Sequence, residues 1–272
     1  MTAFALNHMT VAHLSYRQLL DLAAALGCVG VEVRNDLPQP LFDGIDPQDA
    51  GEMARAKGLR LLALAEVKRF NDWSGSKAAE ARDLMQIAQA AGAEAVSLIP
   101  RNDNLGTGNG ERQAALRIAL KALKPMLEEY DLIGLIEPLG FEICALRFKS
   151  EAVEVIEALD ARGRFKLVHD TFHHTLAQED LMFPDYTGIV HVSGVVDPIV
   201  SLSQMQDSHR ILVDGADRLG NIAQIAELRR LGFAGPVSFE AFAPQVHASA
   251  TPQADLAASI DFVRHGLARK AA

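Results

Sequence analysis

The chain has 272 residues, of which 49% are hydrophobic and 22% are charged, so it can bury one full-sized core. Its formal net charge of −9 repels phosphate backbones and anionic lipid surfaces, so we expect neither nucleic acid nor a membrane as a partner. The two cysteines, Cys28 and Cys144, have no CxxC spacing, which argues against a disulfide scaffold or a thiolate zinc site and fits a reducing cytoplasm.

The first ten residues, MTAFALNHMT, have neither a basic segment nor a long apolar stretch, so we predict no signal peptide. No apolar run approaches the roughly 18 to 20 residues that span a bilayer. We therefore expect a soluble, cytoplasmic protein.

Short apolar runs, many of them β-branched, alternate along the chain with longer amphipathic segments. Eight runs are predicted as strands, over residues 4–10, 29–35, 59–67, 93–100, 133–139, 165–171, 188–195 and 236–242. Helices are predicted over residues 15–27, 77–93, 112–130, 149–163, 221–233 and 251–272. Residues 174–186 carry a proline and aromatics without a clean helical face and are expected to form only a degenerate turn. The pattern predicts an α/β fold, a (β/α)8 TIM barrel forming a single domain over residues 1–272.

Four consecutive predicted strands place an ionisable residue at or near their carboxyl ends: Glu137, Asp170, His191 and Glu240. In a parallel barrel these ends surround one mouth. A single rim carboxylate is as often a helix cap or an ion-pair partner, and a lone histidine is more often structural. Three carboxylates and an imidazole together repel one another unless a cation neutralises them, and this donor set suits Mn²⁺, Mg²⁺, Co²⁺ or Zn²⁺. The four residues therefore predict a divalent-metal site.

Other polar residues at strand ends are candidates for the wall of the same pocket. They are His8, Glu32, Arg34, Glu66, Lys68 and Arg101. Glu32 with Arg34 equally fits a buried structural ion pair, and His8 equally fits a core histidine. Phe70 and Trp73 fit either an apolar wall or ordinary packing. The segment AFAPQVHASATP after the eighth run lacks the glycine-rich turn with which barrels bind phosphate, so we expect an unphosphorylated substrate.

The segments LIEPLGF, LVHDTFHH, GIVHVSG and VSFEAF resemble the metal-ligand strands of the xylose-isomerase-like superfamily of sugar isomerases and epimerases, and the likeness covers nearly the whole chain. This superfamily includes inosose isomerase, hydroxypyruvate isomerase and the ketose 3-epimerases. The resemblance implies a TIM barrel in which Glu137, Asp170, His191 and Glu240 bind one divalent metal ion, with Mn²⁺ the first choice. It also implies possible homo-oligomers, either dimers or tetramers.

The resemblance further implies roles in substrate binding and catalysis. His173 and Arg210 would contact substrate oxygens, although Arg210 also fits a rim salt bridge. Glu137 and Glu240 would act as the catalytic acid and base on opposite faces of an α-hydroxyketone, through an enediolate intermediate. His8 and Glu66 are added as substrate-binding candidates. The expected activity is isomerisation or epimerisation of a keto-inositol or small keto-sugar, with an inosose, and thus inositol catabolism, placed first, ketose 3-epimerisation second and hydroxypyruvate isomerisation third.

Two alternatives remain at this stage. An AP endonuclease of the same superfamily shares Glu137, Glu240 and the histidine–aspartate pairs at 170–173 and 207–209. That enzyme uses further histidines where this chain has Arg34 and Glu66, and it needs a basic groove, which the net charge disfavours. The other alternative is a sugar-binding barrel without catalytic activity, which the intact acidic residues disfavour.

Overall fold

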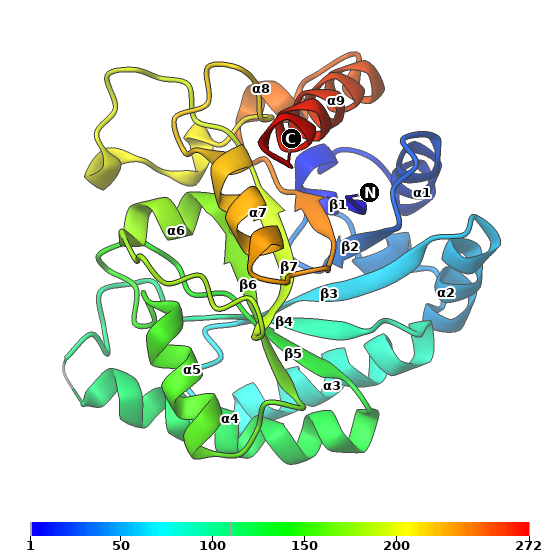
Figure 1. Cartoon of the computed structure of the whole chain (residues 1–272). Helices are drawn as coiled ribbons and strands as arrows, with labels where there is room; N and C mark the ends of the chain where they lie inside the picture. Colours follow the sequence, from blue (N-terminus) through cyan, green and yellow to red (C-terminus); the bar gives the residue numbers. More distant parts are fainter. Residues whose placement is uncertain (1, 109, 272) are drawn as a thin grey trace.

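Eight short parallel strands close into one barrel, in the order in which they occur along the chain, with β8 paired to β1 (Figure 1). The computed structural model describes residues 2–108 and 110–271. The strands are β1 (Phe4–Asn7), β2 (Gly30–Arg34), β3 (Arg60–Lys68), β4 (Ala95–Ile99), β5 (Ile133–Ile136), β6 (Phe165–Asp170), β7 (Thr187–Val192) and β8 (Val237–Phe239). The predicted (β/α)8 TIM barrel is confirmed.

Helices surround the strands, and α9 packs against α7 where the chain closes the ring (Figure 1). The α-helices are α1 (Tyr16–Ala25), α2 (Pro47–Ala56), α3 (Gly75–Ala91), α4 (Glu111–Tyr130), α5 (Lys149–Ala158), α6 (Thr171–Ala177), α7 (Asn221–Arg230), α8 (Pro244–His247) and α9 (Pro252–Ala271). In the described part of the chain, the loops also contain the 3₁₀ helices η1 (His8–Val11), η2 (Leu41–Gly44), η3 (Leu202–Gln204) and η4 (Asp207–His209). Among the described residues, no helix is both long and apolar enough to cross a bilayer.

Local sequence signals explain where the helices begin and end. Ser15 and Gln18 form a capping box at the start of α1, and the Ser74 side chain accepts a hydrogen bond from the Lys77 amide at the start of α3. Helix α3 ends at Gly92, whose φ of 71° lies in the left-handed region that glycine adopts without a steric penalty.

The interior of the barrel is apolar away from its mouth. Buried side chains from six of the strands form one cluster there: Ala5, Leu62, Ala63, Ala95, Leu135, Val168 and Ile189. A larger apolar core lies between the strands and the surrounding helices. The buried ionisable groups that end the later strands lie at the other end of the barrel, where the loops begin.

Several strands are shorter than the sequence predicts. β1 ends at Asn7 because the Asn7 side chain accepts a hydrogen bond from the Met9 amide and starts η1, so His8 lies beyond the strand. Glu137 and Glu240 each follow the last residue of their strand. After β8 the amides of 242 and 243 turn to the Arg210 carbonyl and leave the ladder. The predicted ends were wrong by one to three residues, because side-chain and loop contacts replace strand pairing there.

A degenerate helical turn was predicted over residues 174–186, but the helix in this region, α6, spans Thr171–Ala177 and so begins earlier than predicted. Helix α6 begins at Thr171, inside the predicted sixth strand, because the Asp170 carboxylate accepts a hydrogen bond from the His173 amide, at 2.9 Å, and caps the helix. The helix ends at Gln178, which has a left-handed conformation. Asp170 is thus both the last residue of β6 and the cap of α6, which fixes its position at the barrel mouth.

Candidate metal centre

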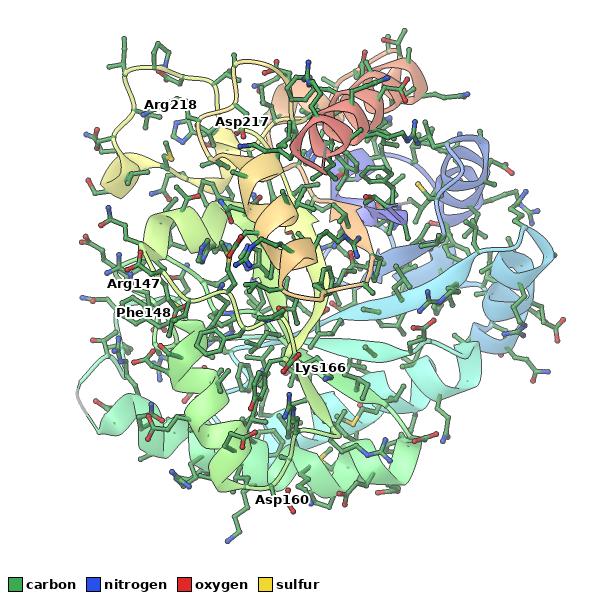
Figure 2. All side chains as sticks on the ribbon, viewed as in Figure 1. Arg147, Phe148, Asp160, Lys166, Asp217 and Arg218 are labelled. Carbon is green, nitrogen blue, oxygen red and sulfur yellow. The ribbon has the colours of Figure 1, made fainter. Side chains whose placement is uncertain are left out.

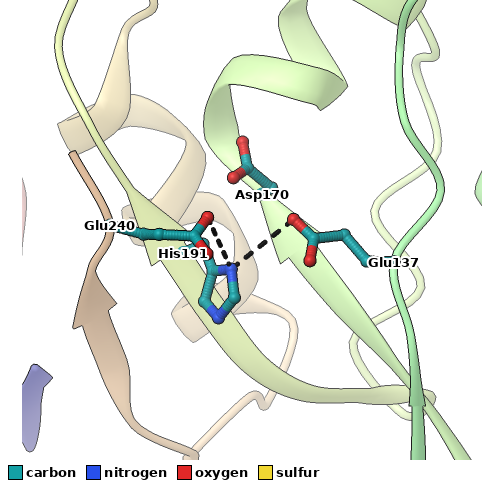
Figure 3. Close-up of side chains that lie close together, drawn as sticks. All are labelled: Glu137, Asp170, His191 and Glu240. Carbon is teal, nitrogen blue, oxygen red and sulfur yellow. Dashed lines mark ion pairs between the residues drawn. The ribbon is translucent and has the colours of Figure 1, made fainter. Parts of the chain in front are cut away.

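The four residues predicted as metal ligands lie together at the carboxyl end of the barrel (Figure 3). One potential ligand atom from each of Glu137, Asp170, His191 and Glu240 lies within 4.8 Å of the others, and all four residues are buried. They come from the ends of β5, β6, β7 and β8, four neighbouring strands. Figure 3 shows Glu240 and Glu137 approaching His191 from opposite sides.

His191 has one ring nitrogen bound and the other available. Its Nε2 lies 2.9 Å from Oε2 of Glu32, which is itself fully buried and accepts a hydrogen bond from Ser238 through Oε1. This contact assigns the ring proton to Nε2. Nδ1 then points toward carboxylate oxygens of Glu240 and Glu137, at 3.2 and 3.5 Å, without a well-directed hydrogen bond to any described residue. A nitrogen lone pair among carboxylates is the arrangement that a cation satisfies.

Negative charge exceeds positive charge among the buried groups of this region. The buried carboxylates are Glu32, Glu66, Glu137, Asp170 and Glu240, against the guanidiniums of Arg34 and Arg210. Burial and the Glu240 charge raise the pKa of Glu137 to about 7. Burial opposes the charge on His191, but Glu32 and Glu240 raise its pKa well above the usual range. Protons thus occupy the cluster when no cation does, and the residues present fit a divalent ion.

Arg210 lies against two of the four candidate ligands. Its Nη2 donates to Oδ2 of Asp170 at 2.5 Å and to Oε2 of Glu240 at 2.9 Å, and its Nε donates to Ser193. The guanidinium carbon also lies 4.4 Å from the centre of the Phe242 ring. These contacts hold a fully buried arginine in one orientation beside the cluster, where it also lines the cavity described below.

The second carboxylate oxygen of Glu240, Oε1, accepts hydrogen bonds from Arg34 and Asn7. The sequence did not predict that these two residues meet at Glu240. Nη1 of Arg34 lies 2.9 Å from Oε1 of Glu240, and Nδ2 of Asn7 lies 3.1 Å from the same oxygen. Arg34 also pairs with Asp36 and Glu66. The sequence also fits an ion pair between Glu32 and Arg34. This pair is not formed, because Glu32 binds His191 and Ser238 instead.

A cavity of about 460 Å³ opens above the cluster, within the size range of ligand pockets. Glu66, His173 and Arg210 lie on its wall, together with Glu137 and Glu240. Among the described residues, His8 is not part of this wall, and its Nε2 contacts the Leu14 carbonyl at 2.9 Å.

The aromatic part of the cavity wall differs from the candidates in the sequence. Phe70 is fully buried in the main core and Trp73 packs against that core, which is the ordinary packing alternative. Phe141 and Phe242 line the cavity instead. They lie in loops after β5 and β8, and only the position of those loops reveals them.

The profile of the family described as xylose isomerase-like TIM barrel matches residues 20–265. The chain belongs to the xylose isomerase-like TIM-barrel family. A xylose isomerase domain-containing protein from Salmonella typhimurium LT2 superposes with a TM-score of 0.90 at 28% identity, covering 98% of this chain and 97% of the other.

Two more distant structures share the fold of the family. An IolI protein with a bound zinc atom has a TM-score of 0.84 at 18% identity, covering 99% of both chains. D-psicose 3-epimerase with D-tagatose, from Clostridium cellulolyticum H10, has a TM-score of 0.76 at 15% identity, covering 98% of this chain and 99% of the other. No curated protein sequence matches the chain significantly.

Glu32 is expected to support metal binding without contacting the ion. A buried carboxylate that orients a ligand histidine typically contributes 10- to 100-fold to metal affinity. We expect Glu32→Gln to weaken Mn²⁺ binding by about that factor, measured by titration calorimetry. Ser238→Ala, which removes only the hydroxyl that donates to Glu32, is the control and should have a smaller effect. Unchanged affinity in Glu32→Gln would show that the His191 orientation does not depend on Glu32.

A second buried polar cluster lies behind β6. Nζ of Lys149 lies 2.9 Å from Nδ1 of His169 and 3.0 Å from Nδ1 of His174, while Nε2 of His169 lies 2.9 Å from Oε1 of Gln224. Gln224 in turn donates to the Thr171 carbonyl. The lysine thereby joins α5, β6, α6 and α7 on the outer side of the barrel.

This cluster gives stability a specific pH dependence. Burial lowers the pKa of Lys149 to about 8, so between that pH and about 10.4 the unfolded chain binds a proton that the folded chain does not. The free energy of unfolding should therefore rise with pH across this window, by up to about 3 kcal/mol. Lys149→Met should remove this rise, and the stability it loses relative to the unchanged protein should be largest at high pH, where the wild-type lysine is neutral and its two hydrogen bonds are made without burying a charge. Urea unfolding at several pH values measures the free energy of unfolding of both proteins. If this free energy changed with pH in the same way in the wild-type protein and in Lys149→Met, the prediction would be contradicted.

Proposed function

We propose that the protein is a divalent-metal-dependent isomerase or epimerase of a small, unphosphorylated keto-sugar or keto-inositol. The observation that carries the proposal is the buried cluster of three carboxylates and one imidazole under a polar cavity at the barrel mouth. The family of the chain and the epimerase among its structural neighbours support this reaction class.

Glu137, Asp170, His191 and Glu240 are the proposed ligands, and Mn²⁺ is the proposed ion, with Mg²⁺, Co²⁺ and Zn²⁺ as alternatives. Mixed oxygen and nitrogen donors are compatible with all four ions. A divalent cation here would polarise the substrate carbonyl and stabilise the enediolate that follows loss of the neighbouring proton.

Glu137 and Glu240 are the proposed acid and base. They approach His191 from opposite sides (Figure 3), so a substrate seated above the cluster would meet one carboxylate on each side. One carboxylate removes the proton next to the carbonyl, and the other returns a proton to the opposite face. Return to the same carbon gives an epimer, and return to the neighbouring carbon gives an isomer.

Three cavity residues are proposed to bind substrate oxygens. Arg210 presents fixed donors beside Glu240, His173 lies next to it on the wall, and Glu66 can accept hydrogen bonds from hydroxyls. Burial raises the pKa of Glu66, although the nearby Arg34 opposes this shift. Substrate binding by His8 stays a prediction. Among the described residues, His8 is not part of the cavity wall.

The substrate class is tested by following exchange of α-protons with D2O by NMR. The metal-loaded protein is incubated with inososes, ketoses and hydroxypyruvate in parallel. We expect exchange with an inosose or a ketose, and the product then distinguishes isomerisation from epimerisation. Bound metal with no exchange on any compound would favour the sugar-binding alternative, and cleavage of abasic DNA would favour the endonuclease.

A further inference from the structure

A second cavity adjoins the one above the metal cluster. It measures about 530 Å³, and Asn102 and Phe141 belong to the walls of both cavities. The remaining walls come from the loops after β5 and β7 and from the end of α6. Asp207 lines the first cavity and its sequence neighbour Gln206 lines the second, so both cavities reach the start of η4.

Most of the hydrogen-bonding side chains on the wall of the second cavity are uncharged, and the two charged ones, Glu142 and Arg147, have opposite signs. Exposed amides and hydroxyls on its wall belong to Gln178, Ser201, Ser203 and Gln206. On the shared wall, Oδ1 of Asn102 is buried and has no hydrogen-bond partner among the described residues. A hydroxyl group of a bound molecule would satisfy this oxygen.

The charged and apolar groups of the wall narrow the class of ligand. Arg147 donates hydrogen bonds to the carbonyls of Gly140 and Leu176, both at 3.0 Å. Its guanidinium also lies over the ring of Phe148 (both residues are labelled in Figure 2). These two bonds use Nε and one hydrogen of Nη2, and the exposed Glu142 on the same wall brings a negative charge opposite in sign to that of Arg147. The half-buried ring of Phe141 offers an apolar surface next to the polar groups. Uncharged donors and acceptors beside an aromatic ring suit the hydroxyls and C–H faces of a sugar.

The position of the second cavity relates it to the first. The Phe141 ring centre lies 5.1 Å from that of His173, on the wall of the metal cavity. A substituent that extends from a molecule seated above the cluster to the second space would run alongside Phe141 and Asn102. At about 30 Å³ per water in the liquid, each cavity has roughly the room of fifteen or more water molecules, which accommodates one sugar unit.

We propose that the substrate is a keto-sugar joined through a glycosidic bond to a second, uncharged sugar, which the second cavity binds. This inference rests on the proposed function, because it places the reacting ketose above Glu137 and Glu240. It adds Asn102, Phe141 and the 201–206 loop as the binding site of the second unit.

Binding to the Mn²⁺-loaded protein tests the inference without requiring turnover. D-fructose is compared by titration calorimetry with turanose, maltulose and isomaltulose, in which glucose is attached to O3, O4 or O6 of fructose. We expect at least one disaccharide to bind about tenfold more tightly than fructose, equivalent to about 1.4 kcal/mol. Equal or weaker binding of all three disaccharides would overturn the inference.

Two matched variants test whether the tighter binding of the disaccharide arises in the second cavity. Ser203→Trp fills the second cavity and should remove the tighter binding of the disaccharide while leaving fructose affinity unchanged. Ser76→Trp is the control, because Ser76 is also an exposed serine whose hydroxyl contacts another serine hydroxyl, as that of Ser203 does. This variant should retain the tighter binding of the disaccharide. A gain that survives Ser203→Trp would contradict the assigned site. Tighter disaccharide binding without proton exchange would refute the proposed reaction alone, whereas exchange on fructose without that gain would refute only the second site.

Discussion

Replacing Glu240 by glutamine should lower the rate of α-proton exchange about 10²- to 10⁴-fold, the range associated with loss of a catalytic acid or base. The substitution preserves the shape of the side chain but removes its negative charge. Glu240 is bound by Arg34, Asn7 and Arg210 and lies 3.2 Å from the His191 ring, so its charge serves both the proposed base and the proposed metal site.

The exchange rate is measured by NMR in D2O on the substrate identified from the panel. Glu227→Gln, which changes an exposed glutamate paired with Arg230 on α7, is the matched control and should retain the wild-type rate. A Glu240→Gln rate within about threefold of the wild-type rate would remove Glu240 from the chemistry.

Mn²⁺ should raise the melting temperature of the metal-free protein substantially. A ligand at a hundred times its dissociation constant stabilises the folded state by about 2.7 kcal/mol. For a chain of this size, that corresponds to a rise of about 5 to 10 °C. The physical cause is neutralisation of the buried carboxylates of Glu137, Asp170 and Glu240.

Scanning calorimetry with and without Mn²⁺ measures this rise. His191→Ala should abolish it, because the variant lacks the only nitrogen donor of the proposed set. His265→Ala, at an exposed position on α9, should show the full rise. An undiminished rise in His191→Ala would place the bound metal outside the cluster.

The sequence contained enough information to predict the barrel and the proposed ligand positions. Alternation of apolar runs and amphipathic segments marks the eight strands, and in a parallel barrel the carboxyl ends of adjacent strands must meet. That topology alone brings Asp170 and His191, on adjacent β6 and β7, together. The closed strand order confirms the topological premise.

The surroundings of these positions could not be predicted in the same way. Glu32 on β2 meets His191 on β7 across the barrel interior, between strands that are not neighbours and residues 159 positions apart. Strand periodicity says which side chains point inward, but not which of them meet across the barrel. The cavity aromatics Phe141 and Phe242 lie in loops, whose course depends on tertiary contacts such as those of Arg210 with the 242–243 backbone.

The central claim is that metal bound by this cluster is required for proton transfer next to a carbonyl. The most direct measurement compares α-proton exchange in D2O for one preparation before chelation, after removal of the metal, and after reloading with Mn²⁺. We predict that exchange is lost on removal and returns on reloading at one ion per chain. Exchange that persists in the metal-free protein, or full reloading without any exchange, would contradict the claim.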